Sequence, residues 1–147
     1  MTIIEVLVVV TVLGIIFAIV IPQFSKNREL QVLKSGAGDV LSTINKARVT
    51  TLSSLNSSSY GVHFQSDKVI IFKGTLFSVN DPNNEAINLT TPANISNVTF
   101  GGVSGNSGDV YFNRLSGSPS TTGTITISSP SFSKIITISA TGVANAN

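Results

Sequence analysis

The first 24 residues constrain this chain more than any other part of it. They read MTIIEVLVVVTVLGIIFAIVIPQF and contain no charged residue from Val6 to Phe24. A helix of about 20 apolar residues spans the hydrocarbon core of a bilayer. The sequence therefore predicts a hydrophobic helix over residues 1–24, suited to a membrane or to a bundle of apolar helices, followed by a polar domain.

This segment does not have the pattern of a cleaved secretory signal. Such a signal has a basic start, a shorter apolar run and a cleavage site of small residues. Here no Lys or Arg precedes the apolar run, which continues into IPQFSKNREL without such a site. We therefore expect the segment to be retained in the mature protein.

Glu5 is the one charged side chain among residues 1–25. An acid near the end of a membrane helix can reach the interface, where its charge is tolerated. An acid buried among apolar helices needs a cationic partner, because an unpaired buried charge is costly. The residues alone leave both interpretations open.

The run TIIEVLVVVTVLGIIFAIVIPQF resembles the N-terminus of mature type IV pilins and of the pseudopilins of type II secretion. The matching features are Thr2, Ile4, Glu5, the apolar run from Val6, Gly14 and Pro22. Met1 occupies the first mature position, where Phe is commoner. The resemblance implies that a prepilin peptidase removes a short basic leader and methylates the amino group of Met1.

The resemblance also implies roles for single residues in assembly. The carboxylate of Glu5 is expected to neutralise the terminal amine of a neighbouring subunit and so to set the axial register. Gly14 and Pro22 are expected to bound a stretch that loses helical hydrogen bonds in the filament; the alternative is a simple proline kink. The side chains expected in the filament core are Val6, Leu7, Val10, Leu13, Phe17 and Phe24.

Residues 25–56 have the period of an amphipathic helix. Their apolar residues recur mostly at steps of three and four, which places them on one stripe. With the first segment they predict one helix of about 55 residues. The expected stripe comprises Leu30, Leu33, Ala37, Val40, Leu41, Ile44, Ala47, Leu52 and Leu55.

Residues 57–147 change to a period of two, which is typical of strands. About eight short strands bounded by turn residues predict one antiparallel sheet or a pair of sheets, packed on the helical stripe. The expected strands are YGVHFQ, KVIIFK, GTLFSV, AINL, NVTF, DVYFNR, GTITIS and KIITIS. GGVSGNSG is interpreted as a flexible loop. The predicted class is α+β, the pilin fold.

The candidate metal ligands are few. His63 is the one histidine, there is no cysteine, and a metal site needs several converging ligands, so we expect His63 to be a strand surface residue. Asp81, Asn83 and Glu85 alternate in DPNNE, but the glycine and later glutamate of a calcium loop are missing, which favours a turn. We expect neither a metal nor a cofactor.

Catalytic and nucleic-acid-binding motifs are also missing from the sequence. It contains neither the G-x-S-x-G elbow of a serine hydrolase nor a phosphate-binding loop, so we expect no enzymatic activity. The C-terminal alternation weakly resembles H-type pseudopilins and FimT-like minor pilins. DNA binding is not indicated, because residues 56–147 carry balanced charges and TGVANAN has no basic residue.

The sequence thus predicts a structural subunit, the major pilin of a type IV pilus. It would be held in the cytoplasmic membrane as a prepilin and then assembled by the pilus machinery into an extracellular homopolymer. Adhesion and twitching motility would be properties of the whole pilus. The alternatives are a minor pilin, a type II secretion pseudopilin, or a membrane-tethered binding module that never polymerises.

Overall fold

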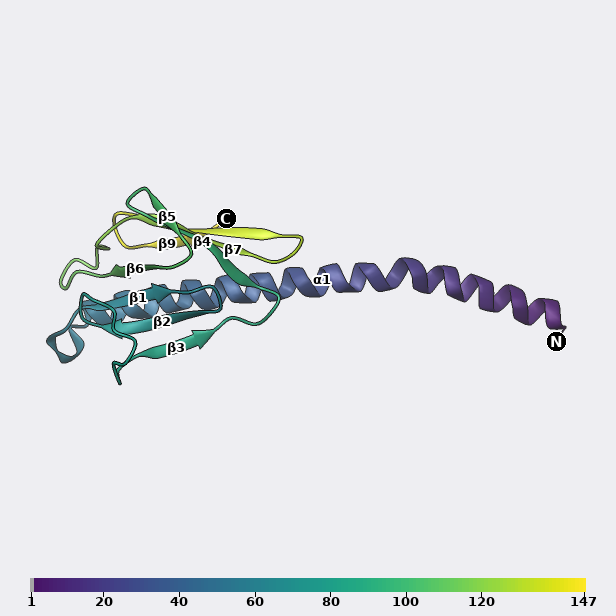
Figure 1. Ribbon diagram of the computed structural model, residues 1–147, viewed down its shortest axis with the longest axis horizontal. Helices are drawn as coiled ribbons and strands as arrows, with labels where there is room; N and C mark the ends of the chain where they lie inside the picture. Colours follow the sequence, from purple (N-terminus) through teal and green to yellow (C-terminus); the bar gives the residue numbers. More distant parts are fainter. Residues whose placement is uncertain (1) are drawn as a thin grey trace.

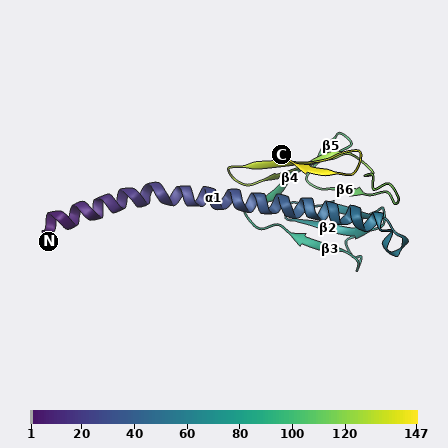
Figure 2. The ribbon, with the colours of Figure 1, turned by 180° about the vertical axis from the view of Figure 1, so that it is seen from behind.

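The computed structural model describes residues 2–147 (Figure 1). One long helix, α1 (Ile3–Leu52), is followed by a short 3₁₀ turn and nine strands in two antiparallel sheets. The first half of α1 projects away from the sheets, and its second half packs against them (Figures 1 and 2). The expected α+β class is confirmed, and the arrangement is consistent with a pilin-like fold.

The helix ends earlier than the sequence predicted. After Leu52 the chain turns at Ser54, whose φ of 51° lies in the left-handed region and cannot continue a right-handed helix. A 3₁₀ turn follows at Leu55–Ser57. Leu55 is exposed outside α1, so its assignment to the helical stripe was wrong.

The buried stripe of α1 is close to the predicted one. Leu33, Ala37, Val40, Ile44 and Ala47 are buried as expected. Leu30 and Leu41 are only half-buried, and Leu52 is exposed. Three small or polar members of the stripe were not predicted from the sequence: Gly36, Thr43 and Thr51.

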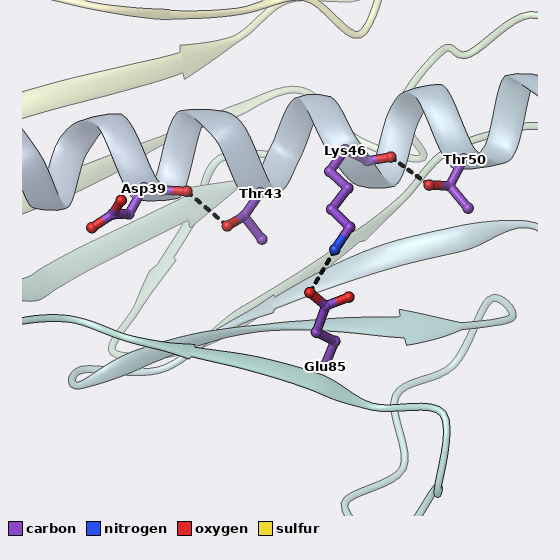
Figure 3. Close-up of polar contacts among 5 residues, drawn as sticks. All are labelled: Asp39, Thr43, Lys46, Thr50 and Glu85. Atoms are coloured by element: carbon purple, nitrogen blue, oxygen red, sulfur yellow. Dashed lines mark hydrogen bonds and ion pairs between the residues drawn. The ribbon is translucent and has the colours of Figure 1, made fainter.

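Threonine is tolerated in this buried stripe because its hydroxyl can donate a hydrogen bond to a backbone carbonyl of the same helix. Thr43 Oγ1 donates to the carbonyl of Asp39 at 2.7 Å, and Thr51 Oγ1 donates to the carbonyl of Ala47 at 2.8 Å. Figure 3 shows the Thr43 bond beside the ion pair between Lys46 and Glu85, which ties α1 to the sheet below it. A buried hydroxyl with a partner escapes the desolvation cost of an unpaired one.

Both sheets pack against the second half of α1 (Figures 1 and 2). In order across the sheet, the first contains β3 (Glu85–Asn88), β2 (Lys68–Lys73), β1 (Tyr60–Phe64) and β6 (Gly108–Tyr111). The second contains β5 (Val103–Gly105), β4 (Asn94–Phe100), β7 (Gly123–Ser128), β8 (Ser133–Ile138) and β9 (Ala144–Ala146). A pair of sheets is therefore confirmed.

The core lies where the inner faces of both sheets meet α1. Phe64, Phe112 and Ile125 have no exposed surface. The ring of Phe64 lies 5.7 Å from that of Phe100, so it joins the two sheets. Arg48 links the C-terminal part of α1 to two loops of the β domain by donating to the carbonyls of Gly117 and Thr141, both at 3.1 Å.

One predicted strand is a loop, one predicted loop contains a strand, and one strand was not predicted. Residues 74–79, GTLFSV, form a loop rather than a strand, because Gly74 has a φ of +105° and turns the chain out of the sheet. Conversely, β5 lies within the expected flexible loop GGVSGNSG, and β9 was not predicted. Strands of three residues are too short to show a period, and neighbouring strands hold them in place.

Candidate functional site

The candidate site is the apolar surface of α1 before residue 25. Every described residue of this segment is exposed, and none of it touches the sheets (Figure 1). By length and composition the helix could cross a membrane. Leaving a large apolar side chain in water rather than burying it costs roughly 1.5–3 kcal/mol. Covering this surface with lipid or with other apolar protein would therefore be favourable.

The residues expected in a filament core all lie on this surface. Their exposed fractions run from 46% for Leu13 to 71% for Phe24. All but Leu7 share one stripe of the helix, as the 3.6-residue period requires. Val8, Ile15 and Ile19 on the opposite side are also exposed. A helix that is apolar all round suits lipid or several neighbouring helices better than a single flat partner.

Glu5 has a local partner within its own helix. Thr2 is the N-cap of α1, and its backbone N–H donates to Glu5 Oε2 at 3.3 Å. A carboxylate here also interacts favourably with the N-terminal end of the helix dipole. Glu5 is otherwise exposed, so its side chain is accessible to a second partner. Met1, the expected processing and methylation site, lies outside the described residues.

Gly14 and Pro22 lie within a continuous helix in this single subunit. A Cβ on Gly14 would meet no atom within 4 Å, so packing inside the subunit does not require glycine there. Pro22 leaves the carbonyl of Ala18 without its usual helical donor, yet α1 continues through it. The expected loss of helical hydrogen bonds concerns the filament and stays a prediction.

The junction between the exposed helix and the domain is fixed by Glu29. The backbone N–H of Ser131, in the turn between β7 and β8, donates to Glu29 Oε1 at 2.6 Å, and Ser131 Oγ donates to Oε2 at 3.1 Å. These hydrogen bonds, above all the backbone one, lower the pKa of Glu29 below its ordinary 4.5. This contact adds to the buried stripe of α1 in holding the domain on the helix.

This contact predicts a pH-dependent contribution to stability. A carboxyl whose pKa is lower in the folded state stabilises the fold above its unfolded pKa, and this contribution is lost as the pH falls through the folded pKa. We expect Glu29→Gln to lower the thermal unfolding temperature at pH 7. The difference in unfolding temperature between the variant and the unmodified chain should shrink below pH 4.5. Melts of the detergent-solubilised chain across pH 3–7 measure this, and a difference that stays constant would contradict it.

His63 is less exposed than the sequence predicted. Its side chain is only 12% exposed, because the ring of Phe77 stacks on it at 3.9 Å. Asp109 binds its Nδ1, and Gln65 lies 3.0 Å from its Nε2. Among residues 2–147 no three His, Cys, Asp or Glu side chains converge as a metal site. His63 therefore acts as a packing residue that holds the loop after β2.

The segment DPNNE forms the expected turn. Asp81 Oδ1 accepts a hydrogen bond from the backbone N–H of Asn83 at 2.8 Å and another from its side-chain amide at 2.7 Å. These bonds, chiefly the backbone one, lower the pKa of Asp81 below its ordinary 3.8. Its carboxylate is thus engaged within the turn and carries a negative charge at neutral pH.

No protein-family model, curated protein or solved structure matches this chain.

Proposed function

We propose that this chain is the major structural subunit of a type IV pilus. The observation that carries the proposal is the division of α1: its first half is apolar all round and fully exposed, and its second half is packed on a polar β domain. The pilin-like motif with Glu5, Gly14 and Pro22 supports it.

Assembly moves the apolar half from one apolar surrounding to another. Before assembly, lipid of the cytoplasmic membrane covers residues 3–24, and in the fibre the same residues of neighbouring subunits cover them. Because lipid and side chains are similarly apolar, the transfer has little hydrophobic driving force of its own. Specific polar pairing must then decide the register, and Glu5 is the group available for it.

Two alternatives predict different locations for the chain. A minor pilin or a type II secretion pseudopilin would enter fibres sparsely, and a tethered binding module would stay in the membrane. The continuity of α1 favours a polymer, because the packed second half of the helix runs directly into the apolar segment, whereas a tether would tolerate a flexible link.

Shearing cells and sedimenting the released fibres without detergent tests the proposal. We expect fibres made predominantly of this chain, counted by quantitative mass spectrometry of the pellet. A trace of the chain in fibres of another subunit would make it a minor pilin. Recovery in the membrane fraction alone would contradict the proposal and favour the tethered module.

A further inference from the structure

A groove runs between α1 and the edge of the second sheet, near the end of the domain that faces the exposed helix. It is largely apolar and is lined by Lys34, Ala37, Gly38, Leu41, Lys134 and Ala146. The two lysines come from different elements, α1 and β8. Neither forms an ion pair within residues 2–147, so the groove combines an apolar floor with two unpaired cations.

The loop of residues 74–84, between β2 and β3, has the complementary character. Leu76 and Val79 are 85% and 76% exposed, although both are large apolar side chains. Asp81 follows them and carries a negative charge. The loop lies at the end of the domain farthest from the N-terminus (Figures 1 and 2).

This loop is held in shape before it meets any partner. Phe77 stacks on His63 and makes an edge contact with Phe72 at 5.7 Å. Asn84 Nδ2 donates to the carbonyl of Ser78 at 2.7 Å. A preorganised loop loses little conformational entropy on binding.

We propose that the loop of residues 74–84 of one copy seats in the groove of the next copy along the filament. Val79 and Leu76 would pack on Leu41 beside Gly38, and Asp81 would lie between Lys34 and Lys134. The inference rests on the proposed function. Because the contact joins unlike surfaces of the subunit, it is heterologous, and such a contact propagates as a helical array when its rotation does not close a ring.

Charge and exposed apolar side chains together distinguish this loop within residues 57–147. There Glu85 is paired with Lys46 and Asp109 with His63, whereas Asp67 and Asp81 form no ion pair within the described residues. Of these two, Asp81 follows the exposed apolar side chains of Leu76 and Val79, and in the groove two unpaired lysines flank an apolar floor. Loop and groove thus match in both polarity and charge.

Cysteine cross-linking within sheared fibres tests this contact. The chain has no cysteine, so Val79→Cys with Gly38→Cys introduces one defined pair. A Cβ on Gly38 meets no atom within 4 Å, and Val79 is exposed, so both changes fit the fold. With a mild oxidant we expect a ladder of disulfide-linked oligomers. The matched control is Val103→Cys with Gly38→Cys, because Val103 is also 76% exposed but lies on β5.

The outcomes separate this inference from the proposed function. A ladder from the Val79 pair and none from the Val103 pair supports the contact. Normal fibres without a ladder from the Val79 pair, or with equal ladders from both pairs, overturn the contact and leave the filament proposal intact. If the unmodified chain forms no fibres, both proposals fall.

A charge exchange gives a second readout. We expect Asp81→Lys and Lys134→Asp each to lower the yield of sheared fibres several-fold, by placing like charges together, and the double variant to restore most of it. Single variants with normal yield, or a double variant no better than the worse single one, would overturn the pairing.

Discussion

Glu5→Ala is expected to abolish filament assembly while the β domain stays folded. In the filament, the carboxylate would compensate the cationic amino terminus of a neighbour among apolar helices. Removing one partner of a buried pair leaves an uncompensated charge and costs about 3–5 kcal/mol. Since 1.4 kcal/mol is tenfold, each subunit addition should weaken by roughly a hundredfold or more. The yield of sheared fibres, against the amount of chain in the membrane, measures this.

A second substitution separates the charge of Glu5 from its role as a helix cap. In the single subunit Glu5 also caps the helix by accepting from the backbone N–H of Thr2. A glutamine can make this cap but carries no charge. Glu5→Gln should therefore fail to assemble as Glu5→Ala does. Normal fibres from Glu5→Gln would show that capping is the role of Glu5 and would contradict the charge pairing.

Phe64→Ala is expected to cause the largest loss of domain stability. Phe64 is fully buried where the two sheets meet, so removing its ring leaves a cavity in the core. Such a change costs about 3–5 kcal/mol, out of a typical total of about 5–15 kcal/mol. The thermal unfolding temperature of the detergent-solubilised chain, followed by near-ultraviolet circular dichroism, should fall steeply.

The matched control for this variant is Leu115→Ala. Leu115 is 89% exposed, so its truncation should change the free energy of unfolding by no more than about 0.5 kcal/mol. A loss below about 1 kcal/mol for Phe64→Ala would mean that the interior does not depend on this ring, contrary to its position between the sheets.

The long elements could be predicted from the sequence because their periods extend over many residues. The stripe from Leu33 to Ala47 repeats for four turns, and GTITIS and KIITIS alternate cleanly. Residues 74–79 were wrongly predicted as a strand because of Leu76 and Phe77. Gly74 turns the chain away from the sheet, and Phe77 packs on His63 instead. That contact is made between distant segments, so no local pattern could predict it.

Some parts of the candidate site could likewise be predicted from the sequence, and others could not. The apolar helix and Glu5 were recognisable because charge is missing around a single acid. The role of Glu29 could not be recognised, because its partner Ser131 is far along the chain and both residues look like ordinary surface residues. The groove beside Lys34 and Lys134 was missed for the same reason, since it forms only when β8 packs beside α1.

The central claim is that residues 3–24 form the core of a filament. The most direct measurement is maleimide labelling of Val10→Cys in sheared, membrane-free fibres, with Val103→Cys on β5, which is 76% exposed, as the reactive reference. The account predicts that Cys at position 10 stays unlabelled until the fibres are dissociated in detergent, while Cys at position 103 labels at once. Equal labelling at both positions in intact fibres would contradict it.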